Sequence, residues 1–283
     1  RHTPDRVIDL CAKVGIRTVP TGIDHGTITA IFDEGPVEIT TLRRDVATDG
    51  RRATIAFATD WREDAARRDF TINALYVHPE TLAISDYFGG LEDLGARRVR
   101  FIGEAEARIA EDHLRIMRYY RFQARFGAEL DQQAEEACER MADTLKGLSR
   151  ERVAEELLKL LALPDPHKTV ARMRTRSVLG VVLPETCSVH VEALAALIGA
   201  ENAQGFARDP VRRLAALLPP SPDVAETCAA RLRLSKAQRA RLVSAAERRM
   251  SDAHEPEALA YRIGVDFAVD RLLLLGEEAR KVA

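Results

Sequence analysis

Residues 67–75 read RRDFTINAL, and the organisation of the chain is clearest when it is followed outward from this segment. Two arginines, an acid and an amide fall within seven residues, beside an apolar pair. Arginines can face phosphate oxygens, while Asp69 and Asn73 can hydrogen-bond sugar hydroxyls. The same residues also fit an ion-paired helix start, so composition alone leaves both interpretations open.

The chain upstream and just downstream of this segment has the pattern of a small α/β head. Apolar residues alternate in strand fashion at 28–32, 37–42, 53–58, 75–77 and 83–86. The turn-forming residues 33–36 predict that the first two strands form a hairpin, and a second hairpin is expected at 75–86. Residues 4–14 predict an amphipathic helix with Pro4 in its first turn.

After Arg97 the chain reads as one helix after another. Helices are predicted at 104–126, 148–163, 166–180, 188–199, 208–217, 222–232, 235–248, 255–262 and 266–281. The expected fold class is α+β: the remainder of a small α/β head with a mainly antiparallel sheet, followed by an all-α neck, body and tail. The expected domains are a head at 1–94, a helical neck at 95–165 and a helical body and tail at 166–283.

Composition limits the class of protein. The 283 residues carry a net charge of −2, and only six of the 42 basic residues are lysine. No run of 18 or more apolar residues occurs, so no membrane partner is expected. The four cysteines are far apart and form no CxxC pair, which suits reduced thiols in the cytoplasm rather than a cysteine-built zinc site.

A second polar segment lies at 111–122, which reads EDHLRIMRYYRF. Asp112, Arg115, Arg118 and Arg121 recur every three residues. On one continuous helix they would form a single, slowly winding polar stripe. A solvated, ion-paired helix face would have the same pattern, so this observation alone does not assign a site.

The segment 67–75 is similar to a signature of the class II tRNA nucleotidyltransferases and bacterial poly(A) polymerases. The resemblance implies that Arg68, Asp69 and Asn73 contact the ribose and phosphates of an incoming nucleotide. The segment 111–122 resembles the family pattern EDxxRxxRxxRF, the amino-acid template. By this resemblance the neck contains a helix that reads the base. Its nucleotide-binding residues are those of the polar stripe: Asp112, Arg115, Arg118 and Arg121.

The chemistry of cytosine and adenine agrees with that role. Each presents an exocyclic amine beside an unprotonated ring nitrogen, which Asp112 and Arg115 can match as acceptor and donor. Uracil and guanine present the reverse pattern and would leave polar groups unpaired, at roughly 1–3 kcal/mol per group. Arg118 and Arg121 are expected to touch phosphate or to brace the site.

Residues 37–43, VEITTLR, are similar to the family pattern vEvTTxR. The resemblance makes Glu38 the candidate catalytic carboxylate and a ligand of Mg²⁺, the expected cofactor. Other similar segments are 20–27 with its glycines and His25, the loop 49–52, the joint 86–94 and the segment 149–159. In the last of these, Glu151, Arg152 and Glu155 are expected to stabilise the neck helix pair.

The family places a GGxVRD turn and a DxD strand before a helix like the one at 4–14, and neither occurs in this sequence. The chain is therefore expected to be an incomplete head that lacks the main metal ligands. As given, it should bind a nucleotide weakly and should not catalyse transfer. The complete protein should do so with Mg²⁺.

The function implied by the resemblance is addition of CCA, from CTP and ATP, to the 3′ end of tRNA. The body and tail at 166–283 are expected to bind the tRNA, in the cytoplasm, with no DNA partner. A poly(A) polymerase shares the head motifs, although this chain lacks the strongly basic tail expected of one. An enzyme that adds only CC or only A also remains open, as does a non-catalytic RNA-binding relative.

Overall fold

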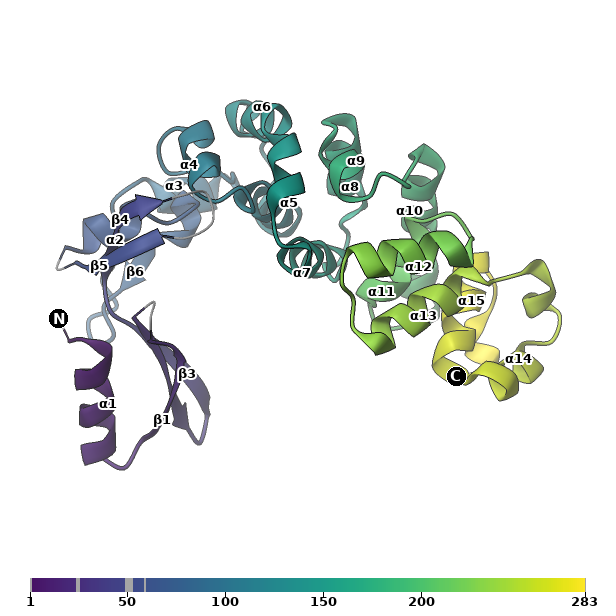
Figure 1. Ribbon diagram of the computed structural model, residues 1–283, viewed down its shortest axis with the longest axis horizontal. Helices are drawn as coiled ribbons and strands as arrows, with labels where there is room; N and C mark the ends of the chain where they lie inside the picture. Colours follow the sequence, from purple (N-terminus) through teal and green to yellow (C-terminus); the bar gives the residue numbers. More distant parts are fainter. Residues whose placement is uncertain (1, 24–25, 49–52, 59, 283) are drawn as a thin grey trace. The chain divides into compact units, whose positions relative to one another are not determined.

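The computed structural model describes residues 2–23, 26–48, 53–58 and 60–282 (Figure 1). The chain divides into two compact units, each described by itself below. One contains Arg1–Ala96 and Arg100–Asp112, and the other contains Arg97–Val99 and His113–Ala283. The fold class is α+β as predicted, with antiparallel strand pairs in the first unit and helices throughout the second.

The first unit begins with a helix packed on a three-stranded sheet. Helix α1 (Pro4–Lys13) contacts β1 (Arg17–Gly22) and β2 (Thr27–Phe32), and β3 (Gly35–Thr40) completes the order β1-β2-β3. Ile28 and Ala30 alternate inward on β2 and are fully buried. The predicted hairpin between β2 and β3 is confirmed, whereas β1 was not predicted.

Two further strand pairs follow, and each is antiparallel. Strand β4 (Arg43–Thr48) pairs with β5 (Ala53–Phe57), and β6 (Leu75–Val77) pairs with β7 (Ile84–Asp86). The hairpin at 75–86 was predicted, but β4 was not. Between the two pairs lies α2 (Trp61–Ala66), another element that the sequence pattern did not reveal because it has fewer than two turns.

The joint at 86–94 is folded against the segment 67–75. Asp86 accepts hydrogen bonds from the backbone N–H groups of Gly90 and Leu91, both at 2.9 Å, and so satisfies two donors in the first turn of α3 (Gly90–Gly95). A Cβ atom at Gly90 would overlap the carbonyl oxygen of Thr71, so this close approach requires glycine. Thr71 also donates its hydroxyl to the buried Asp93 at 2.6 Å.

The predicted single helix at 104–126 is wrong. The chain forms α4 (Ala105–Glu111) and then α5 (Arg115–Phe126), and Asp112 between them is extended, with φ −151° and ψ 105°. An aspartate at a helix C-terminus is disfavoured by the helix dipole, which agrees with a break at this residue. Asp112 therefore does not lie on one continuous helical stripe with Arg115.

The second unit is helical along the part that the structure describes. Its α-helices are α5, α6 (Gln132–Arg140), α7 (Arg150–Leu161), α8 (His167–Thr175), α9 (Val178–Val182), α10 (Ser188–Gln204), α11 (Pro210–Ala216), α12 (Pro222–Arg231), α13 (Lys236–Ala246), α14 (Pro256–Ile263) and α15 (Val265–Leu275). The sequence predicted most of these but missed α6, and it merged α8 with α9. Short 3-10 turns lie at Ala142–Gly147, Met250–Ala253 and Ala279–Lys281.

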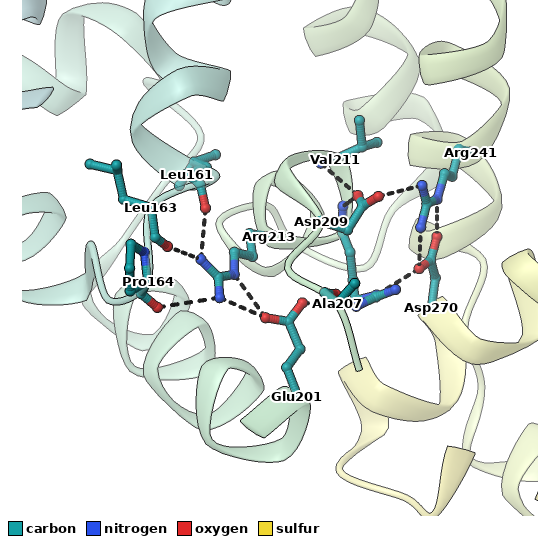
Figure 2. Close-up of polar contacts among 11 residues, drawn as sticks. Leu161, Leu163, Pro164, Glu201, Ala207, Asp209, Val211, Arg213, Arg241 and Asp270 are labelled. Atoms are coloured by element: carbon teal, nitrogen blue, oxygen red, sulfur yellow. Dashed lines mark hydrogen bonds and ion pairs between the residues drawn. The ribbon is translucent and has the colours of Figure 1, made fainter. Parts of the chain in front are cut away.

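Buried arginines hold the C-terminal helices together (Figure 2). Arg213 on α11 is fully buried and donates to the Glu201 carboxylate on α10 and to the carbonyl oxygen of Leu161, both at 2.8 Å. Its neighbour Arg212 donates to the other oxygen of Glu201 at 2.8 Å and to Asp270 on α15 at 2.7 Å. Two carboxylates and two guanidinium groups thus join α10, α11, α15 and the end of α7.

The same network continues to α13 through Arg241. This side chain donates to Asp270 at 2.8 Å and to Asp209 at 2.6 Å. Asp209 also caps α11 by accepting from the backbone N–H of Arg212. Because hydrogen bonds join most of these buried charges to one another, the desolvation cost of each is offset by its partners.

Replacing Glu201 by alanine should leave Arg212 and Arg213 with an uncompensated charge in the interior. We expect the free energy of unfolding to fall by about 3–5 kcal/mol, measured by chemical denaturation of the chain. Glu226→Ala is the matched control, because Glu226 pairs with Arg239 at the surface and should contribute at most about 1 kcal/mol. Equal losses in the two variants would contradict the assignment.

Candidate nucleotide-binding site in the first unit

A cleft of about 510 Å³ lies in the first unit, next to the segment 67–75. It is bordered by the start of the chain and α1, by the end of β3 and the residues after it, by α2, and by β6. Its lining residues are His2, Val7, Ile39, Thr40, Thr41, Leu42, Trp61, Asp64, Arg68 and Tyr76. The hydroxyl of Thr41 donates to the backbone oxygen of His2 at 2.9 Å and ties two of these borders together.

The Asp64 carboxylate is the centre of the polar contacts in this cleft. Asp64 lies on α2 and is only 2% exposed. Its Oδ1 accepts from the Arg67 guanidinium at 2.7 Å and from the backbone N–H of Arg43 at 3.1 Å. Its Oδ2 accepts from the Tyr76 hydroxyl at 2.7 Å and from Arg68 at 3.3 Å. One side chain thereby joins α2, β4, β6 and the segment 67–75.

These contacts shift two pKa values. Burial by itself would raise the pKa of Asp64, but the hydrogen bonds from Arg67 and Tyr76 and the charge of Arg67 outweigh it and hold the pKa below its usual value. Burial and the hydrogen bond to Asp64 raise the pKa of Tyr76 to about 12. Near neutral pH the cleft therefore contains an ionised Asp64 and a neutral Tyr76.

Arg68 has a guanidinium group that is only partly used by the protein. It donates to the carbonyl oxygen of Asn73 at 3.2 Å and to Asp64, and it lies over the Tyr76 ring at 5.2 Å from the centroid. A guanidinium carries five N–H donors. Its side chain is 36% exposed and lines the cleft, so it can still donate to an anion there.

Asp69 and Asn73 bind each other. The Asn73 amide donates to Asp69 Oδ1 at 2.9 Å, and the backbone N–H of Phe70 donates to the same oxygen at 3.0 Å. The backbone of the segment is held as well, because Ile102 N–H donates to the Asp69 carbonyl at 3.1 Å. Arg68, Asp69 and Asn73 are therefore brought together, although only Arg68 lines the cleft.

Glu38 is the candidate catalytic carboxylate. It is exposed on β3 opposite Thr29, and it is not among the residues that line the cleft. Among the described residues, no group of three or more His, Cys, Asp or Glu side chains could hold a metal ion. The described residues therefore do not fit a metal site by themselves.

In the second unit, arginine side chains of α5 form ion pairs with a carboxylate of α7. Arg121 donates to the buried Glu156 at 2.6 Å, and Arg118 lies 4.0 Å from the same carboxylate. Both guanidinium groups lie over the Phe122 ring. Arg121 thus braces α5 against α7, which is one of the two roles expected for it, while Arg115 is half-buried at the first position of α5.

For Glu151 and Glu155, the expectation that they stabilise the neck helix pair was wrong. Glu151 binds Arg233 and Ser149, and Glu155 binds Lys159, all at exposed positions, so neither links α5 to α7. Glu156 makes that link instead. Its helical spacing from Val153 and Leu160, which are buried, was the available sequence signal for an inward-facing residue.

Two features that the resemblance singled out, His25 and the loop 49–52, lie outside the described residues. Gly26 is described and has φ +77°, a left-handed conformation that favours glycine.

Comparison with protein families agrees with this arrangement. Residues 2–100 match the family described as the poly A polymerase head domain. Residues 127–189 match the family described as a probable RNA- and SrmB-binding site of polymerase A. The first match includes the cleft and the segment 67–75, and the second lies within the helical unit.

Individual relatives point to the same group. The mitochondrial CCA tRNA nucleotidyltransferase 1 of Danio rerio is 46% identical over 163 residues, 56% of this chain and 38% of that protein. The human protein of the same name is 39% identical over 227 residues, 78% of this chain and 51% of that protein. The chain thus spans about half the length of these relatives, or less.

A solved structure resembles the whole chain. The Bacillus stearothermophilus CCA-adding enzyme in complex with CTP has a TM-score of 0.77 and 26% identity, and the match covers 100% of this chain and 68% of that one.

Across the described residues, no helix is long and apolar enough to cross a membrane.

The Asp64 contacts predict a pH-dependent stability. Asp64→Asn keeps the shape but removes the charge that Arg67 and Arg68 face, so we expect a loss of about 2 kcal/mol of unfolding free energy at pH 7. Because the folded pKa of Asp64 is lowered, its stabilisation is present above about pH 4 and is lost as the pH falls through the folded value.

Denaturation of the parent and of Asp64→Asn should therefore give curves that converge in acid. Glu63→Gln is the control, since Glu63 is an exposed neighbour on α2. A gap between parent and Asp64→Asn that stays constant from neutral to acid pH would show that the Asp64 charge is not the cause.

Proposed function

The chain belongs to the class II family of tRNA nucleotidyltransferases and bacterial poly(A) polymerases, and we propose that its protein adds CCA to the 3′ end of tRNA from CTP and ATP. The observation that carries the proposal is Arg68, held by Asp64 and Asn73 with donors facing a cleft in the head. Relatives named CCA-adding enzymes support this choice over poly(A) synthesis.

Residues of the segment 67–75 would bind the sugar and phosphates of the incoming nucleotide. Arg68 has a charged planar fork suited to phosphate oxygens. Asp69 and Asn73, which hydrogen-bond each other next to Arg68, are the candidates for the ribose hydroxyls. Because Arg68 and Asn73 are also joined, the phosphate and ribose contacts would be fixed relative to one another.

Asp112 and Arg115 would select the base. Asp112 is the extended residue that follows α4, and Arg115 is the first residue of α5, so the two do not share one helix. Asp112 accepts from the exocyclic amine of C or A, and Arg115 donates to the ring nitrogen. Arg118 and Arg121 would support this end of α5 through Glu156.

In the reaction, the 3′ hydroxyl oxygen of tRNA attacks the α-phosphorus of the nucleotide. The new P–O bond forms as the bond between the α-phosphorus and pyrophosphate breaks. The hydroxyl proton passes to solvent or to a general base. Binding of the sugar, phosphates and base aligns the triphosphate for in-line attack. The helices at 166–283 would hold the tRNA in this proposal.

A divalent metal enters the proposal as a requirement and not as a described site. Glu38 is the candidate carboxylate for Mg²⁺, although no group that could hold a metal ion occurs among the described residues. A cytoplasmic location is also part of the proposal, supported by four cysteines that are all free.

The test is to incubate the complete reading frame with tRNA that lacks its 3′ end and to supply CTP and ATP separately and together. We expect CC with CTP alone, CCA with both, and no product when Mg²⁺ is removed by a chelator. Long A tails without C would establish poly(A) polymerase. Addition of only CC or only A would establish a partial enzyme, and RNA binding without transfer would establish a non-catalytic relative.

The base-selection proposal has its own test in the same protein. Asp112→Ala should reduce the preference for CTP and ATP over UTP and GTP by about tenfold, because roughly 1–3 kcal/mol of unpaired polar cost disappears. Selectivity is measured as the ratio of kcat/KM values. Glu111→Ala is the adjacent control, since Glu111 pairs with Arg108. Unchanged selectivity in Asp112→Ala would remove Asp112 from base reading.

A further inference from the structure

Trp61 is a large aromatic residue that lines the cleft and is half exposed to solvent. It is the first residue of α2, it is 51% exposed, and it lines the cleft with Asp64 and Arg68. The spacing 61, 64, 68 puts these three side chains on one side of the helix and the turn that follows it. The exposed part of such a ring can stack on a flat apolar ligand.

The ring of Trp61 is held in place by Tyr76. Their centroids are 5.0 Å apart at an interplanar angle of 75°, an edge-to-face contact that leaves ring surface uncovered. Tyr76 is fixed in turn by its hydrogen bond to Asp64, and Arg68 lies over its ring. The result is an ordered aromatic surface beside a cation, within one cleft.

We propose that Trp61 is the stacking platform for the terminal base of the RNA that is extended. Proteins that bind single-stranded nucleic acid combine aromatic faces, on which bases stack, with cations that attract the backbone. Trp61 supplies the face and Arg68 the positive charge, and both line the same 510 Å³ cleft. This inference rests on the proposed function, because it assumes an RNA substrate.

The chemistry of stacking favours the RNA terminus over the incoming nucleotide. The incoming base must be discriminated, which requires hydrogen bonds to its edge. The base at the 3′ terminus changes after each addition, so its site must accept different bases. Stacking has this tolerance because every base has a π face.

Trp61 is also the only tryptophan of the chain, so its fluorescence reports on this site alone. The chain is titrated with short single-stranded RNA ending in C or in A, and separately with CTP and ATP. Emission should fall with either RNA, at concentrations at which CTP and ATP have little effect. Equal quenching by CTP alone would overturn the proposal. So would Trp61 emission that stays the same when RNA binds.

The second measurement is the RNA affinity of variants, determined from the fluorescence anisotropy of labelled RNA. Trp61→Ala should weaken binding about tenfold, equivalent to 1.4 kcal/mol, and Trp61→Phe should restore most of it. Phe32→Ala is the matched control, because Phe32 is a half-exposed aromatic residue of the same unit that does not line the cleft. Thermal unfolding of each variant identifies any that fail to fold.

The two proposals fail in different ways. If the complete protein transfers no nucleotide but Trp61 responds to RNA, the platform stands and the enzymatic function falls. If transfer proceeds and Trp61→Ala leaves both RNA affinity and the KM for tRNA unchanged, the platform falls and the function stands.

Discussion

The carboxylate of Asp64 is the contact on which the candidate site depends. One nearly inaccessible side chain accepts hydrogen bonds from Arg67, Arg68, Tyr76 and the β4 backbone. A buried charge is tolerated only when such partners surround it, so the fold must keep all of them in place. The orientation of Arg68 and the position of the aromatic pair are both consequences of this requirement.

The parts of the fold that were predicted are those with local signals. The β2–β3 and β6–β7 hairpins follow from alternation and turn residues, and most helices of the second unit follow from apolar periodicity and proline or glycine boundaries. Short elements such as α2 span too few residues for a periodic pattern. Their conformation is decided by tertiary contacts, above all those of Asp64 on α2.

The break at Asp112 shows a different limit. The residues 104–126 have helical periodicity on both sides, and a pattern continues across one extended residue without a visible gap. A similar limit applies to Glu156, which resembles its exposed neighbour Glu155 in sequence but differs in burial. Motif resemblance does not separate two such neighbours, whereas the helical spacing of Glu156 from Val153 and Leu160, which are buried, indicates that it faces inward.

The arginine content has two separate explanations in the structure. Arg212, Arg213 and Arg241 are turned toward Glu201, Asp209 and Asp270 and serve the stability of the helical unit. Arg68 is held by fewer contacts and keeps donors toward a cleft. Because both kinds contribute equally to the net charge, that charge does not measure affinity for RNA. The decisive quantity is the number of guanidinium donors that the carboxylates of the protein leave accessible, and it depends on the fold.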